Sequence, residues 1–273
     1  TYTHYNTIDE PTRWVKFIDE TTCGNKELAI YLKKALGYTL TGSAEEQCFF
    51  ECLGDGCNGK SVMVSIMLAY MGSYAIHSNI ETFLDSKYGS NGKEASPNIA
   101  AMVGVRFIST EEPKEGSILN NDFIKSLSAG GEVSGRRLYG NEFTFKSKAK
   151  LWITCNNELI IRGTTNGDWR RVREIPFLNI IPDNKIDKQL EDKLRAEIPS
   201  ILKWCVDGCI RWKNEGLGMP AIVKEATEKY KKNMDMVQKF LDENCIFVPS
   251  TREKSSDLFY EYKDWATLSN EYN

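Results

Sequence analysis

A glycine-rich stretch, GDGCNGKS at residues 54–61, constrains this sequence more than any other feature. It fits the pattern G-x-x-x-x-G-K-[S/T], in which glycines let the backbone N–H groups of a loop approach a phosphate closely. A following helix adds unpaired N–H groups at its N-terminus, the lysine reaches the β- and γ-phosphates, and the last hydroxyl binds Mg²⁺. The alternative is a glycine-rich turn with an accidental Lys-Ser pair. The stretch predicts a site for ATP and Mg²⁺ formed by Gly54, Asp55, Gly56, Cys57, Asn58, Gly59, Lys60, Ser61 and Val62.

The residues around this loop predict an α/β fold. An apolar run over 47–53 precedes the loop as a strand candidate, and a helical pattern over 61–72 follows it. Further strand candidates lie at 104–110, 151–155 and 171–177, and helical patterns lie at 11–40, with Gly37 as a stop, and at 122–131, 187–213 and 221–244. Such alternation predicts a mainly parallel sheet flanked by N-terminal and C-terminal helical segments. We expect a helical lead-in at 1–45, a core at 46–215, and a helical segment with a tail at 216–273.

Two acidic residues follow the second strand candidate. Glu111 and Glu112 come directly after the apolar residues of 104–110. One carboxylate can hold Mg²⁺ through water, and the other can orient the attacking water as general base. An ordinary pair of surface glutamates is the alternative. The expected Mg²⁺ ligands are therefore Ser61, Glu111 and Glu112.

An amide and two arginines complete the candidate catalytic residues. Asn156 follows the strand candidate 151–155 and can hold the attacking water or sense the γ-phosphate, although asparagine is also a common turn residue. Arg170 and Arg171 precede the last strand candidate, where a guanidinium can act on the nucleotide of a neighbouring subunit. A surface charge pair is the alternative. The catalytic set is Lys60, Glu111, Glu112, Asn156, Arg170 and Arg171.

Positive charge is concentrated in one part of a chain whose formal net charge is -3. Between Lys125 and Arg173 there are ten cations and four anions, so this block can face a polyanion. A solvated surface is the alternative that charge alone leaves open.

Length and composition set the remaining bounds. The 273 residues suffice for one large domain, and no apolar run reaches the ~18 residues that a membrane span requires. The eight cysteines form no C-x-x-C pair, which favours reduced thiols in a cytosol-like compartment. Because the chain begins with Thr1, we expect it to be part of a longer protein.

The order of these motifs resembles the superfamily 3 helicases. GDGCNGKS, then RFISTEEPKEG, then the segment from FIKSLSAGG to LWITCNN, and finally DWRRVREIPF occur in the order and spacing of that family, over about residues 11 to 245. The chain is most similar to the helicase part of phage and plasmid primase-helicases, whose relatives include poxvirus-type replication helicases. Glu132 and the NNEL segment depart from the usual pattern without removing a catalytic group.

The resemblance implies an AAA+ type fold, a homohexameric ring with the lead-in as an oligomerisation collar, and ATP hydrolysis with Mg²⁺. It implies translocation along single-stranded DNA, usually 3′ to 5′, with unwinding of forked duplex during phage, plasmid or viral DNA replication. It also implies a primase or primase-polymerase domain upstream, no membrane partner, and a location in the bacterial cytoplasm or at a viral replication site. The residues that it assigns to DNA binding are Lys125, Arg136, Arg137, Lys146 and Lys148. The first three match the segment before a DNA-contacting channel hairpin, and Lys146, Lys148 and Lys150 flank the return strand of that hairpin.

Other classes of protein share part of this pattern. A DNA-packaging motor or a transcription-activating AAA+ protein would keep Lys60 and Glu112 without unwinding DNA. A small-molecule phosphotransferase would need a lid and an acceptor pocket, for which the sequence shows no signal. A binding module that has lost hydrolysis is disfavoured by the intact lysine, serine and glutamates.

Overall fold

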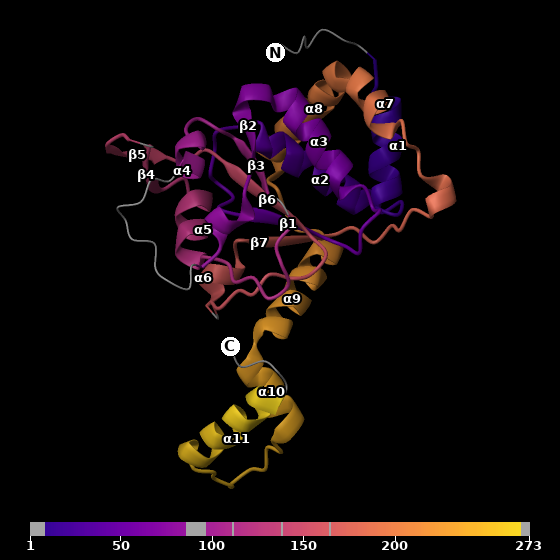
Figure 1. Cartoon of the computed structure of the whole chain (residues 1–273). Helices are drawn as coiled ribbons and strands as arrows, with labels where there is room; N and C mark the ends of the chain where they lie inside the picture. Colours follow the sequence, from indigo (N-terminus) through magenta and orange to yellow (C-terminus); the bar gives the residue numbers. More distant parts are fainter. Residues whose placement is uncertain (1–8, 86–96, 111, 138, 164, 269–273) are drawn as a thin grey trace. The chain divides into compact units, whose positions relative to one another are not determined.

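A sheet of five parallel strands lies at the centre of the first of two units of the chain, residues 1–227 (Figure 1). The computed structural model describes residues 9–85, 97–110, 112–137, 139–163 and 165–268. The strands follow the order β2 (Ala75–Ser78), β3 (Phe107–Thr110), β6 (Lys150–Cys155), β1 (Phe49–Leu53) and β7 (Val172–Pro176). The predicted α/β fold with a mainly parallel sheet is confirmed, and β2 is a strand that the sequence patterns did not predict.

The strand order brings three loops to one edge of the sheet. β6 lies between β1 and β3, with Phe50 of β1 opposite Trp152 and Ile108 of β3 opposite Leu151. Because all five strands are parallel, their carboxyl ends meet at the same edge, and the connections after β1, β3 and β6 start there. Ligands of open α/β sheets bind at such an edge, where the strand order reverses.

Helices cover both faces of the sheet. One face carries the main hydrophobic core, in which Phe50, Phe107 and Trp152 contact helices from both ends of the unit. These helices are α1 (Thr12–Thr21), α2 (Lys26–Thr39), α3 (Lys60–Met71), α7 (Leu190–Ala196) and α8 (Ile198–Glu215). On the other face, α5 (Asn121–Ser128) places Ile124 against Phe49 and Val172.

The lead-in helices belong to the same unit as the sheet. α2 crosses α8 so closely that a Cβ on Gly37 would lie 2.1 Å from the backbone nitrogen of Cys209, and one on Gly208 would lie 2.0 Å from the carbonyl oxygen of Lys33. Gly37 is therefore a packing residue inside α2, and the prediction that it ends the helix is wrong. The boundaries expected at 45 and 215 do not coincide with the division between the units, which falls after Thr227.

The helical pattern over 187–213 is divided between α7 and α8. Glu197 lies at the junction, and its carboxylate accepts hydrogen bonds from the backbone nitrogens of Arg13 (3.0 Å) and Trp14 (2.9 Å). It thereby caps the N-terminus of α1, where N–H groups have no partner inside the helix. The predicted helical pattern over 187–213 is confirmed, and the structure divides it into two helices with this tertiary cap at the break.

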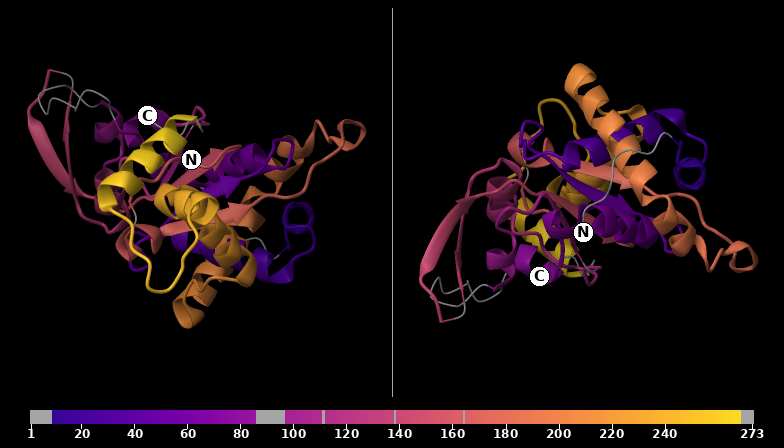
Figure 2. Two further views of the ribbon diagram at one scale, coloured as in Figure 1. Left: turned by 90° about the horizontal axis from the view of Figure 1, so that it is seen from below. Right: turned by 90° about the horizontal axis from the view of Figure 1, so that it is seen from above.

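A two-stranded antiparallel hairpin extends from the sheet. β4 (Glu132–Arg136) pairs with β5 (Glu142–Lys146), and the hairpin stands out from the body of the first unit in both views of Figure 2. Gly131 at the start of β4 donates its N–H to the carbonyl of Ser126 in α5 at 2.9 Å. The hairpin is thus joined directly to the end of α5.

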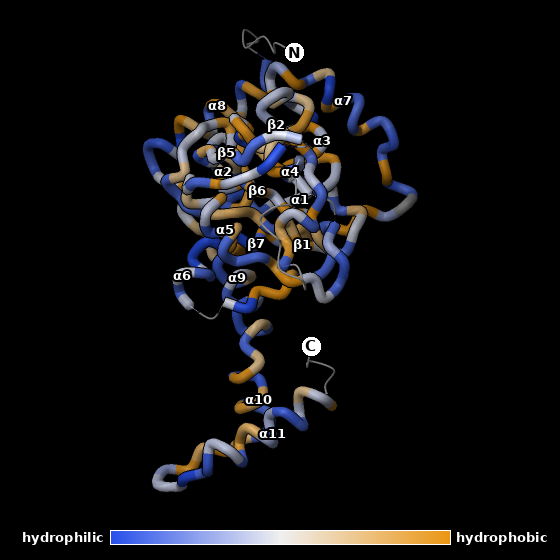
Figure 3. The backbone as a smooth tube through the Cα atoms, turned by 60° about the vertical axis from the view of Figure 1, so that its left-hand side comes forward, coloured by the Kyte–Doolittle hydropathy of each residue, from blue (hydrophilic) through white to orange (hydrophobic). Residues whose placement is uncertain are grey.

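Short elements and a second unit complete the chain. The short elements are α4 (Pro97–Ala101), α6 (Asn166–Trp169) and three 3-10 turns at Gly72–Tyr74, Ile80–Phe83 and Asp183–Lys185. The boundary between the units falls within α9 (Ala221–Met234), and the second unit contains α10 (Met236–Asn244) and α11 (Ser255–Leu268). Hydrophilic and hydrophobic residues alternate along these last two helices (Figure 3). Within the described ranges, no helix combines the length and the apolar composition that crossing a bilayer requires.

Candidate functional site

The glycine-rich loop leaves β1 and enters α3 in the order that the sequence predicted. Gly56 and Gly59 both have φ of +91°, a left-handed conformation that favours glycine. A Cβ on Gly59 would also lie 2.7 Å from the Thr21 side chain, and one on Gly54 would lie 2.4 Å from the Phe177 carbonyl. The glycines are therefore required by backbone conformation and by packing at the start of α3.

A cavity of about 630 Å³ opens beside this loop at the carboxyl edge of the sheet. It brings together predicted residues from three separate segments: Lys60 and Ser61 after β1, Glu112 after β3, and Asn156 after β6. Its full lining is Gly56, Cys57, Asn58, Gly59, Lys60, Ser61, Val62, Val64, Ser65, Leu68, His77, Thr110, Glu112, Thr154 and Asn156. Glu111, the other predicted acid, lies outside the described residues.

Asn156 links the lysine of the loop to the acid of β3. Its side-chain oxygen Oδ1 accepts a hydrogen bond from Lys60 Nζ at 3.0 Å, and its backbone N–H donates to Glu112 Oε1 at 3.2 Å. Lys60 Nζ also donates to the carbonyl oxygen of Gly54. Burial lowers the pKa of Lys60, while nearby acidic groups, among them Glu112 and Asp55, act in the opposite direction. A cation held by neutral oxygens in this way can turn to an anionic ligand.

Six lining residues of this cavity were not predicted from the sequence, among them Thr110, His77 and Thr154. Thr110 is buried, and its Oγ1 has no hydrogen-bond partner among the described residues. His77 Nδ1 lies 2.9 Å from Ser109 Oγ, and Thr154 lines the cavity from β6. The position of Thr110 immediately before the two glutamates was an available signal, whereas His77 lies on β2, which no pattern revealed.

A smaller cavity of about 170 Å³ lies near Gly59 of the loop, and Thr21 lines it. Thr21 contacts the loop at Gly59, and Leu178 follows Phe177, whose carbonyl accepts a hydrogen bond from Asn58 Nδ2 at 3.3 Å. The lining combines the α1–α2 connection with the end of β7 and the start of α9, through Thr21, Thr22, Cys23, Asn25, Leu28, Pro176, Leu178 and Ile222. It can accept a group with apolar faces and polar edges.

The two predicted arginines differ in exposure. Arg170 is exposed, and its guanidinium donates to Gln47 Oε1 at 2.7 Å. Arg171 is half-buried, donates to the carbonyl of Gly167, and lines a small internal cavity of about 10 Å³. Burial, and then the charge of Arg170, lowers the pKa of Arg171. Arg170 is therefore the arginine with access to a neighbouring molecule.

The basic block is divided between surface and interior. Arg136 lies at the end of β4, Arg137 follows it and stacks on the Phe143 ring at 5.5 Å, and Lys146 ends β5. The arginines are thus at the far end of the hairpin, whereas the sequence comparison placed them before it. Lys148 is exposed near the hairpin base, where its stem packs against Gly42.

Two lysines of the block are engaged inside the molecule. Lys125 Nζ forms a 2.7 Å ion pair with Asp168, whose side chain is 4% exposed. Lys150 is buried, and its amine donates to the carbonyl oxygens of Thr41 and Lys148 and lies 4.7 Å from the centre of the Tyr38 ring. Lys150 therefore cannot belong to a DNA-facing surface, and the geometry of Lys125 disfavours the contact that was predicted for it.

The strand order, the glycine loop and the polar residues at one edge of the sheet define an α/β P-loop core. No family model matches the chain. Two solved structures of the C-terminal region of NrS-1 share its fold, each at 12% sequence identity. One has a TM-score of 0.67 and covers 86% of this chain and 55% of its own chain. The other has a TM-score of 0.63 and covers 87% of this chain and 58% of its own chain.

Sequence relatives come from large DNA viruses. "Putative helicase L207/L206" of Acanthamoeba polyphaga mimivirus is 26% identical over 260 residues, which cover 88% of this chain and 27% of that protein. "Putative helicase 022R" of Frog virus 3 is 26% identical over 88% of this chain and 26% of that protein. "Putative primase C962R" of African swine fever virus is 26% identical over 78% and 24%. The chain spans about a quarter of the length of these relatives, and the similarity confirms the predicted resemblance to helicases of the viral primase-helicase type.

Proposed function

We propose that this chain is the ATP-hydrolysing motor of a DNA helicase that acts in viral DNA replication. The observation that carries the proposal is the hydrogen-bonded series Lys60, Asn156 and Glu112, which joins the loop, the central strand and the acidic segment across one cavity. This is the arrangement that phosphate binding and water activation both require.

The residues around the cavity fit a magnesium-bound triphosphate. The loop N–H groups and the N-terminus of α3 would hold the phosphates, with Lys60 Nζ turning from Asn156 to the β- and γ-oxygens. Ser61, Glu112 and the hydroxyl of Thr110, which has no hydrogen-bond partner within the described ranges, supply oxygen atoms of the kind that Mg²⁺ prefers. When bound, the ion would neutralise charge on the phosphate oxygens.

Hydrolysis is then carried out by this chain's own groups. Glu112 accepts a proton from the attacking water, because its carboxylate lies at the cavity and is held by the Asn156 N–H at 3.2 Å. Asn156 presents its side-chain amide beside Lys60 and can bind the same water or the γ-phosphate. Glu111 would assist with Mg²⁺, because one of the two adjacent carboxylates can hold the ion through water while the other acts as the base.

We place the nucleobase in the cavity of about 170 Å³ next to Gly59. Leu178 and Ile222 provide apolar contact, and the side chains of Thr22 and Asn25 lie at the cavity wall. Because a base is anchored mainly by apolar contact with a few polar groups, this lining suits it. A Leu178→Asp substitution should therefore raise the KM for ATP more than it lowers kcat.

The remaining parts of the proposal concern assembly and DNA. Arg170 would reach the nucleotide of an adjacent subunit in a hexameric ring, because it is exposed while Arg171 is directed into its own subunit. The β4–β5 hairpin would contact the phosphates of single-stranded DNA through Arg136, Arg137 and Lys146, and translocation would run 3′ to 5′. A primase or primase-polymerase domain would precede the chain in the full protein.

The test is the ATPase rate with and without single-stranded DNA, followed by unwinding of a forked duplex. The wild-type chain should hydrolyse ATP faster with DNA, and Lys60→Ala should abolish turnover while the matched surface variant Lys203→Ala keeps it. Glu112→Gln should bind ATP and turn it over ~10²-fold more slowly, the scale expected for the loss of a general base. DNA-stimulated hydrolysis without unwinding would instead indicate a packaging-type motor, and normal turnover by folded Lys60→Ala would overturn the proposal.

A further inference from the structure

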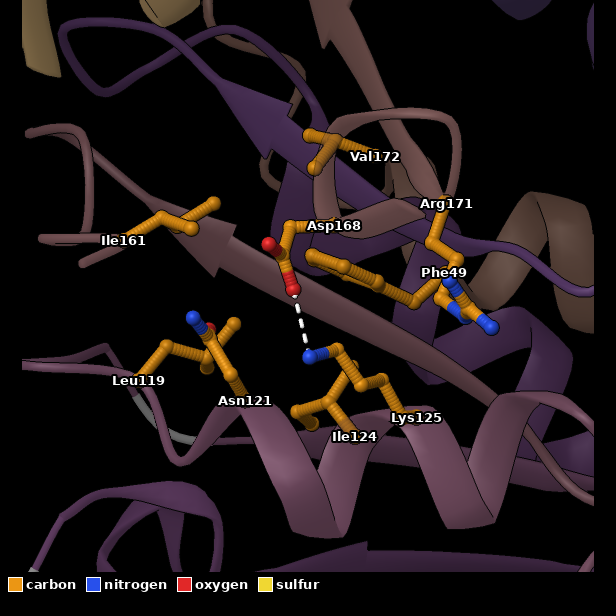
Figure 4. A pocket seen from close by; sticks show the side chains of 9 residues that line it. All are labelled: Phe49, Leu119, Asn121, Ile124, Lys125, Ile161, Asp168, Arg171 and Val172. Atoms are coloured by element: carbon orange, nitrogen blue, oxygen red, sulfur yellow. Dashed lines mark ion pairs between the residues drawn. The ribbon is translucent and has the colours of Figure 1, made fainter. Parts of the chain in front are cut away.

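Lys125 joins two elements of the fold, although 39% of its side chain is exposed. Its amine is 2.7 Å from Asp168 Oδ1 and 3.8 Å from Asp122 Oδ1, but only the Asp168 carboxylate is buried, with 4% of its side chain exposed against 97% for Asp122. Figure 4 shows Lys125 reaching from α5 to Asp168, and Ile124, Ile161 and Val172 line the same small cavity. The principal partner of Lys125 is therefore an acid on a different element.

Asp168 fixes the conformation of the segment that carries the arginines. Its Oδ2 accepts hydrogen bonds from the backbone N–H of Thr165 at 3.3 Å and from its hydroxyl, which closes a capping box at α6. Gly163 packs so closely that a Cβ there would lie 2.4 Å from the Asp168 carboxyl carbon. Arg170 and Arg171 follow within one helical turn, and the Arg171 N–H donates to the Asp168 carbonyl at 3.2 Å.

At its other end, Lys125 belongs to the last turn of the helix that holds the hairpin. The Lys125 carbonyl accepts a hydrogen bond from Ala129, and the next carbonyl, of Ser126, accepts one from Gly131 at 2.9 Å. The Gly131 carbonyl in turn accepts from Ser147 on the return side of the hairpin at 3.0 Å. The first strand of the hairpin is thus tied to α5 at Ser126, next to Lys125, and the return side is tied to α5 through Gly131.

We propose that Lys125 is a positioning residue that couples the β4–β5 hairpin to the arginine segment through its ion pair with Asp168. The proposal rests on the proposed function and deepens it, because it states how DNA at the hairpin changes the geometry of the arginine that serves the next subunit. A shift of α5 that follows the hairpin is transmitted to α6 by a charge-assisted contact, and α6 carries Arg170 with it.

The experiment compares Lys125→Met, Lys125→Arg and the surface control Lys203→Met, whose lysine pairs with Asp207 at 3.5 Å on α8. For each variant we would measure the ratio of DNA-stimulated to basal ATPase rate, the KM for ATP, and single-stranded DNA affinity over a range of salt. Lys125→Met should lower the stimulation ratio about tenfold, within the 5- to 150-fold range of typical couplings between sites. Its DNA affinity, salt dependence and KM should match the wild type, Lys125→Arg should retain most of the stimulation, and Lys203→Met all of it.

Two outcomes would overturn the coupling alone. If Lys125→Met weakens DNA binding with a shallower salt dependence, Lys125 contacts a phosphate directly. If it retains the full stimulation ratio, the ion pair does not transmit the signal. Should Lys125→Met fail to fold, Asp168→Asn, which keeps an acceptor for Thr165 but removes the charge, must show the same loss. A wild-type chain whose ATPase ignores DNA would instead overturn the proposed function and the coupling together.

Discussion

Replacing Asn156 by aspartate tests the proposed nucleotide site most directly. The substitution keeps the shape of the side chain and puts a negative charge 3.0 Å from Lys60 Nζ. In the wild type a neutral amide oxygen releases Lys60 easily to a phosphate. In Asn156→Asp the lysine is held by a carboxylate, and an incoming triphosphate meets an additional negative charge.

The distance sets the expected magnitude. Two unit charges 3.0 Å apart attract each other by about 5.5 kcal/mol at an effective dielectric constant of about 20. Asn156 is exposed, so solvation of the new carboxylate opposes this attraction, and we take roughly half of it, about 2.8 kcal/mol. Because 1.4 kcal/mol corresponds to tenfold, the Kd for ATP should rise about 100-fold.

A fluorescent ATP analogue titrated into the protein measures this Kd. The matched control is Asn157→Asp, which adds the same charge one residue further along, on another exposed asparagine. Asn156→Ala should bind ATP with nearly wild-type affinity but lose catalytic rate, since it frees Lys60 and removes the amide. If Asn156→Asp and Asn157→Asp weaken ATP binding equally, the reasoning is refuted, because the effect would then come from the added charge alone. Unchanged ATP binding by Asn156→Asp would refute it as well.

Three further predictions concern packing, pH and DNA. Gly208→Ala should destabilise the first unit by about 1–3 kcal/mol, because the new Cβ would lie 2.0 Å from a backbone oxygen. A thermal melt should show a clear fall in Tm for this variant. The control Gly42→Ala should show no such fall, because a Cβ there meets only the flexible side chain of Lys148. Burial lowers the pKa of Lys150 to about 7, so the unfolded chain binds one more proton than the folded chain between pH 7 and about 10, and the free energy of unfolding rises with pH in that range. Denaturant titrations should show that Lys150→Met lacks about 2 kcal/mol of this rise between pH 7.0 and 8.5. At higher pH the raised pKa values of the buried thiols of Cys48 and Cys52 act in the opposite direction. Arg136→Ala with Arg137→Ala should weaken single-strand binding similarly on all sequences and reduce its salt dependence by about one ion per lost phosphate contact; a loss confined to one sequence would instead indicate base readout.

The sequence predicted the parts of the fold whose local pattern matches their environment. β1, β3 and β6 are rich in apolar residues because they are buried central strands, whereas β7 at the edge mixes apolar and charged residues. Each predicted segment contains the observed strand or overlaps nearly all of it. β2 was missed because it is a four-residue strand at the edge of the sheet, half-exposed and without an apolar run. The strand β4 was also missed, since its alternation is carried by only Val133 and Gly135.

The candidate site was predictable for residues whose side-chain chemistry and position in a motif together indicate one role. Lys60, Ser61, Glu112 and Asn156 reach the same cavity because parallel strands end at one edge. The lysines of the basic block were not predictable in this way. Lys125 and Lys150 differ from their exposed neighbours only through partners contributed by distant segments, α6 and the end of α2, which charge counting cannot reveal.

The central position of β6 has a mechanical consequence. Its six residues span about 20 Å, with Asn156 just beyond one end and the hairpin beginning four residues before the other. Hydrogen bonds to β1 and β3 hold it on both sides, so a pull along its axis loads many bonds in shear at once. Lys150 anchors its first residue as well. β6 is therefore held firmly between its neighbours, and residues 147–149 are the short link that joins it to the hairpin.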